Sequence, residues 1–135
     1  MNEIVNIIGK KTIITNFKET DINDTYISWL NDKEVLQYSN QRFIKHTKKS
    51  CLSYLSKFKN KNLFLCIRSL LDEKPIGTMT VYYSIPHGTV SIGIMIGNKK
   101  SWGSGIGTDS WITLSNWLLK KDIIYQWYEH VVPCF

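Results

Sequence analysis

The feature that most constrains this chain is a run of alternating glycines, Gly103, Gly105 and Gly107, placed directly before a helical pattern. Glycine tolerates positive φ and has no Cβ to block a ligand, so such a loop can turn successive main-chain N–H groups toward one point. The helix that follows adds its own unpaired N–H groups and the positive end of its dipole. We therefore expect a cradle for a diphosphate, with Lys99 and Lys100 adding positive charge beside it. The simpler alternative is a tight strand-to-helix turn without a ligand.

Three segments before the glycine loop have the composition of consecutive strands. They cover residues 63–68, 76–83 and 90–95, and they are rich in apolar and β-branched residues. Turns at residues 72–75 and 86–88 separate them, and two short connections in succession predict an antiparallel meander.

A first and a last strand complete the predicted sheet. Residues 12–16 and 123–132 have strand composition, and the last strand follows the meander through the glycine loop and a helix over residues 108–120. Such a crossover is expected to be right-handed and to make the two strands parallel. The chain, residues 1–135, is therefore predicted to be a single α/β domain of the α+β type. Its sheet is mixed, mainly antiparallel and flanked by helices.

Two further helices are expected between the first two strands. The first carries an apolar face that includes Tyr26 and Trp29, and either Thr20 or Asp21 can serve as its N-cap. Thr47 is the expected N-cap of the second.

Composition excludes several classes of protein. A chain of 135 residues allows one domain, and its apolar runs are shorter than the ~20 residues that a bilayer span needs. The first residues lack the order of a secretory signal, and the three cysteines form no C-x-x-C. We therefore expect a cytoplasmic protein with reduced thiols and no metal site. The net charge of +6 comes from scattered lysines, which argues against nucleic acid as a partner.

Other phosphate-binding loops fit the glycine run less well. A Walker loop needs a lysine after its last glycine, and none follows Gly107. A dinucleotide fingerprint needs G-x-G-x-x-G after the first strand of a parallel sheet, with an acid about 20 residues further on. Glu129 stands at a suitable distance, but Gly107 is misplaced and the loop follows a meander. A dinucleotide site is thus the second interpretation.

The segment Trp102-Gly103-Ser104-Gly105-Ile106-Gly107-Thr108-Asp109 resembles the acetyl-CoA pyrophosphate motif of the GNAT superfamily of N-acetyltransferases. The branch that contains ribosomal-protein and sugar N-acetyltransferases is the most similar, although Trp102 occupies the position that is Gln or Arg in the general motif. Four further segments agree with this branch: residues 21–34, 42–47, 75–78 and 92–98.

This resemblance implies transfer of an acetyl group from acetyl-CoA to a primary amine by direct attack on the thioester. The amine would belong to a small molecule, an aminosugar or a protein N-terminus, and the acceptor would lie near Trp29 and Arg42. The strand end would hold the pantetheine arm, and the glycine loop would hold the pyrophosphate. The cofactor-binding residues implied are Ile94, Met95, Ile96, Trp102, Gly103, Ser104, Gly105, Ile106, Gly107 and Thr108.

Catalytic residues are harder to name. His87, in the turn at residues 86–88, is a candidate general base because neutral imidazole suits proton transfer near pH 7. Asp109 lies in the first helical turn, where an acid favours the dipole, and capping is its simpler role. The resemblance implies that a main-chain N–H near Met95 stabilises the developing oxyanion.

The resemblance also sets an expectation for the end of the chain. Family members continue past the fifth strand into another helix and a closing hairpin, and residues 125–135 do not match that continuation. We therefore expect a shortened fold that lacks both, with an open sheet edge that invites homodimerisation. A module that binds coenzyme A without turnover is the alternative to an enzyme.

Overall fold

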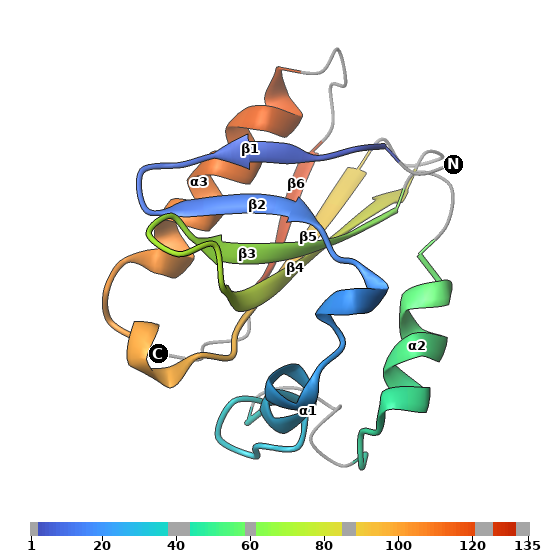
Figure 1. The fold of residues 1–135 in the computed structure, drawn as a ribbon. Coiled ribbons are helices and arrows are strands. Elements are labelled where there is room, and N and C mark those ends of the chain that lie inside the picture. The colour runs from blue at the N-terminus through green and yellow to red at the C-terminus, as the bar shows by residue number, and fades with distance from the viewer. Residues whose placement is uncertain (1–2, 38–43, 59–61, 85–88, 121–125, 132–135) are drawn as a thin grey trace.

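A mixed sheet forms the centre of the fold (Figure 1). The computed structural model describes residues 3–37, 44–58, 62–84, 89–120 and 126–131. These residues form six strands in the order β1-β2-β3-β4-β5-β6, antiparallel throughout except for the parallel pair β5 and β6. The strands are β1 (Asn6–Ile8), β2 (Thr12–Asn16), β3 (Leu63–Ser69), β4 (Pro75–Ser84), β5 (Thr89–Ile96) and β6 (Gln126–Val131). The predicted class, the meander and the parallel last strand are confirmed.

One strand was not predicted. β1 has only three residues, too few to show an alternation, and it pairs with β2 in the register Ile7↔Ile14. Its turn into β2 is held by the Gly9 N–H, which donates to the Thr12 carbonyl at 2.7 Å. β1 therefore becomes one edge of the sheet.

Three α-helices flank the sheet among the described residues: α1 (Asp24–Leu30), α2 (Lys48–Ser56) and α3 (Ile106–Leu119). Thr47 caps α2 as predicted, its side chain accepting from the Ser50 N–H at 3.2 Å. The predicted cap of α1 is wrong: Asn23, not Thr20 or Asp21, accepts from the Tyr26 N–H at 2.9 Å. Asp21 is unavailable because its carboxylate accepts two hydrogen bonds from Arg68, at 2.8 and 3.0 Å.

The helices cover opposite faces of the sheet (Figure 1). Successive side chains on a strand point to opposite faces, and directly paired residues share a face. Phe64 of β3 stacks on Phe17 with centroids 4.5 Å apart and meets Tyr54 of α2 edge-on at 5.4 Å, which identifies the α1 and α2 face. Thr12 bonds α3 through Asp109, which identifies the other face. Apolar side chains are buried on both faces of the sheet, for example Phe64 on the first face and Leu114 of α3 on the second.

Candidate functional site

The glycine loop joins the end of β5 to α3. A short 3₁₀ turn, η4 (Lys99–Ser101), comes first, and α3 then begins at Ile106, two residues before the predicted start. Gly103 and Gly105 have φ of 78° and 83°, a left-handed conformation that costs other residues roughly 1–2 kcal/mol. Gly105 is the N-cap of α3. Glycine is therefore required by the backbone at both positions.

Several main-chain donors of this loop are unpaired, although those of Ser101, Trp102 and Ser104 have acceptors. Within the described part of the chain, no acceptor receives the N–H of Gly103 or of residues 105–108. The first N–H of α3 with a partner is that of Asp109, which donates to the Gly105 carbonyl at 2.9 Å. Five unpaired N–H groups at a helix N-terminus favour an anion.

These donors border a hollow of about 400 Å³ between the end of β5 and α3. Its wall is apolar on the strand side and glycine-rich on the loop side. The lining residues are Ile94, Ile96, Ser101, Trp102, Gly103, Gly105, Ile106, Gly107, Thr108 and Trp111. Most of the predicted cofactor-binding residues thus come together at one hollow, which has room for the diphosphate end of a nucleotide ligand.

Two predicted members of this group have other positions. The Ser104 hydroxyl donates to the Ser101 carbonyl, and the Ser104 carbonyl accepts from Lys11 Nζ at 2.6 Å. Met95 lines a different hollow, on the face covered by α1 and α2. Met95 and Ile94 are neighbours on β5, so their side chains point to opposite faces.

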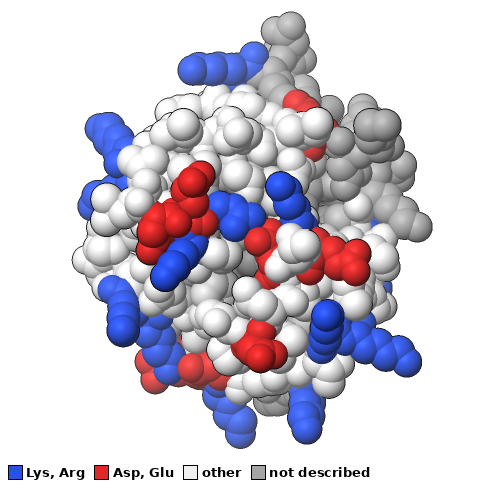
Figure 2. All heavy atoms as spheres, in the orientation of Figure 1, with Lys and Arg blue, Asp and Glu red and all other residues white. Residues whose placement is uncertain are grey.

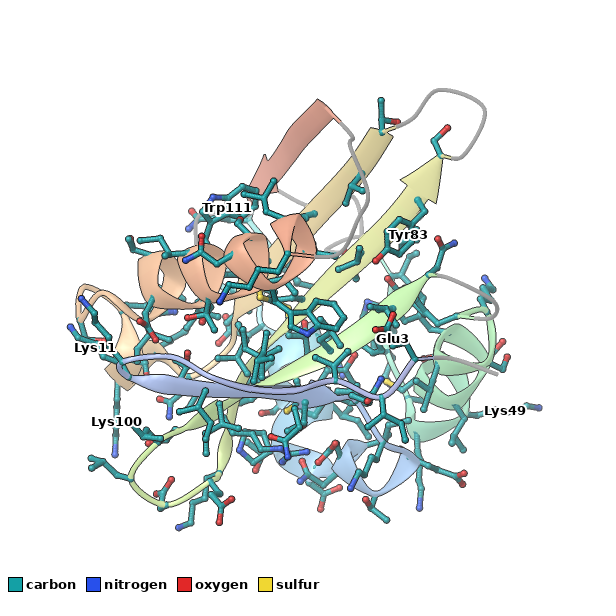
Figure 3. All side chains as sticks on the ribbon, turned by 90° about the horizontal axis from the view of Figure 1, so that it is seen from above. Glu3, Lys11, Lys49, Tyr83, Lys100 and Trp111 are labelled. Carbon is teal, nitrogen blue, oxygen red and sulfur yellow. The ribbon has the colours of Figure 1, made fainter. Side chains whose placement is uncertain are left out.

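The positive charge at the loop comes from an unexpected residue. Lys99 pairs with Asp32 at 2.8 Å and with Glu34 at 3.6 Å, and Lys100 lines the hollow beside Trp29, so neither expected lysine faces the diphosphate cradle. The hydrogen bond from Lys99 also lowers the pKa of Asp32. Lys11 instead reaches the loop from the β1–β2 turn (Figure 3). Only the tertiary contact identifies it, because nothing in the sequence separates Lys11 from the other lysines.

Asp109 ties that turn to α3. Its carboxylate accepts from the Lys10 N–H at 3.1 Å, the Lys11 N–H at 3.0 Å and the Thr12 hydroxyl at 2.8 Å. Burial alone raises a carboxyl pKa, but these hydrogen bonds outweigh it and hold the pKa of Asp109 below its ordinary value. Gly9 lies so close that a Cβ there would be 2.6 Å from Asp109 Oδ2. Asp109 therefore joins α3 to the β1–β2 turn, 97 residues away in the sequence at Thr12, and acts as neither a base nor a helix cap.

The edge of β5 that faces β6 is paired up to Ile94 and has no described strand partner beyond it. Pairing of described residues with β6 extends to Ile94↔Val131. Gly97 donates to the Ile76 carbonyl of β4 at 3.0 Å, so the alternation along β5 turns the N–H of Met95 toward β4 and that of Ile96 toward β6. The Ile96 carbonyl on that side accepts from Trp102 Nε1 at 2.9 Å. Ile94 on this edge is engaged with β6, so the donor that β5 could offer across it is the N–H of Ile96, not that of Met95.

A second hollow of about 570 Å³ lies on the α1 and α2 face. The expectation from the sequence puts an acceptor beside the first helix, so we call this hollow the acceptor groove. It shares Ile94 with the first hollow, so the two meet at β5. Tyr54 lines it and its hydroxyl lies 3.3 Å from that of Tyr82, and burial together with this contact raises the pKa of Tyr54. His46 also lines the groove, which sequence reasoning missed because its neighbours in space come from α1, α2 and β5.

The remaining predicted site residues lie elsewhere. His87 and Arg42 fall outside the described residues, so their roles stay predictions. Trp29 is buried in the core, packs on the Gly97 backbone and lines a third hollow with Lys99 and Lys100 rather than the acceptor groove.

Thiol and metal chemistry find little support in the described residues. Cys51 and Cys66 are free and buried, and burial raises the pKa of Cys66 to about 12, which makes its thiolate scarce. Among the described side chains no three His, Cys, Asp or Glu residues converge as a metal site. No helix within the described ranges is long and apolar enough to cross a membrane.

Comparison with known proteins gives a consistent result. The family model for the acetyltransferase (GNAT) domain matches residues 11–129. The crystal structure of an acetyltransferase (GNAT family) from Bacillus anthracis has a TM-score of 0.75 at 15% identity, covering 93% of this chain and 72% of that chain. A Vibrio cholerae protein, provisionally described as a ribosomal-protein-serine acetyltransferase, has a TM-score of 0.67 at 9% identity, covering 90% and 70%. Apo FdhC, a nucleotide-linked sugar GNAT, has a TM-score of 0.66 at 17% identity, covering 84% and 65%.

At these identities the solved structures establish a shared fold. Across the structures compared, this chain spans between 59% and 74% of the other chain's length. No curated protein sequence matches it.

Proposed function

Because this chain belongs to the acetyltransferase (GNAT) family, we propose that it transfers an acetyl group from acetyl-CoA to a primary amine. The single observation that carries the proposal is the set of unpaired N–H groups at Gly103 and residues 105–108, beside a hollow that continues along β5. Backbone donors at a helix N-terminus suit a diphosphate, and acetyl-CoA carries such an anionic group near its centre.

The residues present fit this cosubstrate in two parts. The loop donors would hold the diphosphate, with the Lys11 ammonium nearby as a counter-charge. The pantetheine arm would pair with the β5 edge beyond Ile94, where the pairing with Val131 ends among the described residues. When bound, acetyl-CoA supplies the reactive thioester carbonyl.

The acceptor amine would enter from the opposite face, through the acceptor groove, and attack that carbonyl directly. The groove must orient the amine and accept a proton from it, and a main-chain N–H must stabilise the developing oxyanion. Ile96 is the proposed source of that N–H, since the Met95 N–H points to β4 and Ile94 pairs with β6. His46 and His87 are the two candidate bases, and pH–rate profiles of His46→Gln and His87→Gln distinguish them.

Two alternatives are a dinucleotide site and a binding module without turnover. A dinucleotide site needs a loop after the first strand of a parallel sheet, whereas this loop follows an antiparallel meander. A binding module without turnover would use the same loop and differ only in chemistry. Turnover therefore has to be measured separately from binding.

The test is calorimetric titration with acetyl-CoA of the parent chain, Gly105→Val and Ile112→Val, followed by thiol release with a panel of amines. Valine at position 105 strains the left-handed backbone and crowds Lys11 Nζ, 3.0 Å from the Cβ position, so we expect affinity to fall at least tenfold. Ile112 is exposed on α3 outside the hollow, and its variant should bind normally. Undiminished binding by a folded Gly105→Val would contradict the proposal, and binding without thiol release would favour the module.

A further inference from the structure

The charge of the acceptor groove is one-sided. Among the described residues that line it, Lys57 is a full cation and none is Asp or Glu. The sequence extends the same imbalance, because residues 35–71 contain no acidic residue at all. Eight basic residues lie in that stretch: Arg42, Lys45, Lys48, Lys49, Lys57, Lys59, Lys61 and Arg68. A polycationic acceptor would find no carboxylate partner in this lining.

This imbalance is local rather than general. On the face shown in Figure 2, Lys and Arg are interspersed with Asp and Glu and do not gather into one patch. Arg68 of β3, which lies on the α1 and α2 face, forms an ion pair with Asp21 at 2.8 Å. Lys99 forms one with Asp32. Lys57 has no such ion pair among the described residues, so its charge is left to act on what enters the groove.

The rest of the lining is largely apolar, but it also carries hydroxyl groups. Ser53 comes from α2, and Thr78 and Thr80 come from β4. Ser50 and Tyr54 of α2 also line the groove, but the Ser50 hydroxyl already bonds the Thr47 backbone and the Tyr54 hydroxyl contacts that of Tyr82. Thr78 and Thr80 share a face, two residues apart, so their hydroxyls lie along one wall. Such groups both donate and accept hydrogen bonds, which suits a ligand that carries several hydroxyls of its own. The space of about 570 Å³ is sufficient for a molecule of monosaccharide size and more.

The strand register locates the cation relative to the reacting end. Met95 pairs with Thr78, and the next row on the same face contains Gly93, Thr80 and Phe64. Adjacent rows on one face are roughly 7 Å apart. Tyr54 meets Phe64 at 5.4 Å, and Lys57 follows Tyr54 by three residues on the α2 side. Lys57 is the C-cap of α2, so the cation belongs to the α2 side of the groove, whereas Met95 belongs to the β5 side.

From these features we infer that the acceptor is a small polyhydroxylated amine that also carries a phosphate or carboxylate group, which Lys57 binds while the amine reaches β5. The inference rests on the proposed function and specifies its substrate class. It predicts discrimination in both directions, since Lys57 attracts an anion and repels an extra cation. Polyamines are excluded as good acceptors on the same ground.

The test compares glucosamine 6-phosphate, glucosamine and spermidine as ligands of the CoA-saturated protein by calorimetry, and as acceptors by thiol release. We expect glucosamine 6-phosphate to bind about tenfold more tightly than glucosamine, and spermidine to bind most weakly. The preference for the phosphorylated amine should shrink as salt is raised.

Lys57→Met and Lys49→Met form the matched pair of variants. Both remove one lysine from the α2 region, but Lys49 projects away from the body of the molecule (Figure 3) and does not line the groove. We expect Lys57→Met to abolish the tenfold preference with little effect on glucosamine, and Lys49→Met to retain it. An equal loss in both variants, equal binding of the two sugars, or no binding of either sugar would overturn the inference.

The same measurements separate this inference from the proposed function. Failure of acetyl-CoA to bind removes the proposed function, while a phosphate preference that depends on Lys57 in the protein without CoA would still support the groove assignment. Conversely, rapid acetylation of spermidine with no preference for the phosphorylated sugar would support the acetyltransferase and refute the substrate class.

Discussion

At the scale of single residues, Asp109 shows how much the position of the glycine loop's neighbours depends on one carboxylate. Its carboxylate accepts three hydrogen bonds from the β1–β2 turn, and that turn carries Lys11 to the loop. The sequence placed Asp109 correctly in the first turn of a helix. It could not indicate the partners, because they lie almost a hundred residues away in the chain.

We expect Asp109→Asn to lower the free energy of unfolding by about 1–3 kcal/mol, since an amide cannot accept at both terminal atoms. The pKa of Asp109 is below that of an unfolded-chain aspartate, near 4, so its contribution is present above that pH and is lost as the pH falls through the folded pKa. Urea unfolding from pH 3 to 7 checks this. The parent should lose stability toward pH 3 more steeply than Asp109→Asn, and parallel curves would contradict this role of Asp109.

Lys11 and Lys10 are adjacent lysines with different expected roles. Both lysines are exposed, but Lys11 Nζ donates to the Ser104 carbonyl at 2.6 Å, whereas the Lys10 side chain has no hydrogen bond to a described residue. We expect Lys11→Met to weaken acetyl-CoA binding about fivefold to tenfold, and Lys10→Met less than twofold, because only the first removes a cation from the diphosphate site. Calorimetric titration of both variants is the measurement. Equal losses would mean that net charge alone, not position, is responsible.

At the scale of elements, the entry into α1 is where sequence and structure disagree most clearly. Thr20 and Asp21 have the right chemistry for an N-cap, but Arg68 occupies Asp21 and the chain makes a 3₁₀ turn first. We expect Asn23→Ala to cost about 1 kcal/mol of stability and Thr20→Ala less than about 0.5 kcal/mol. Thermal or urea unfolding of both variants decides between the two caps, and the reverse order would restore the sequence prediction.

The strands were more predictable than the site. β3, β4 and β5 form through local apolar patterns bounded by turns, so their limits could be read from composition. Most of the diphosphate hollow was predictable too, because its donors are consecutive in the chain. The acceptor groove was not, since it is assembled from α1, α2, β4 and β5 and no single segment carries its pattern. The pairing of Lys99 with Asp32 is likewise a tertiary fact.

At the scale of the whole molecule, β6 forms one edge of the described sheet (Figure 1). An edge strand presents main-chain groups that a second strand can pair with. The register Ile92↔Glu129 in a parallel ladder turns the N–H groups of Trp127, Glu129 and Val131 away from β5. Among the described strands β6 is thus one of two sheet edges, with β1 the other, and we propose β6 as the edge through which two copies associate.

We expect sedimentation to show association that increases with protein concentration. Glu129→Pro removes an outward N–H and should weaken association while leaving the fold intact, since proline is tolerated on edge strands. Tyr128→Pro removes an N–H that points toward β5 and should lower stability instead. A parent chain that remains monomeric at high concentration would contradict this expectation.

Ile94 borders both hollows, one on each side of β5. Two hollows that meet at one strand would let acetyl-CoA and the amine bind from opposite faces at the same time. A ternary complex would then form before any product leaves. Initial-rate measurements should then give intersecting rather than parallel double-reciprocal lines. Ile94→Val shortens a residue that lines both hollows, so titration of each ligand separately should show weaker binding on both sides.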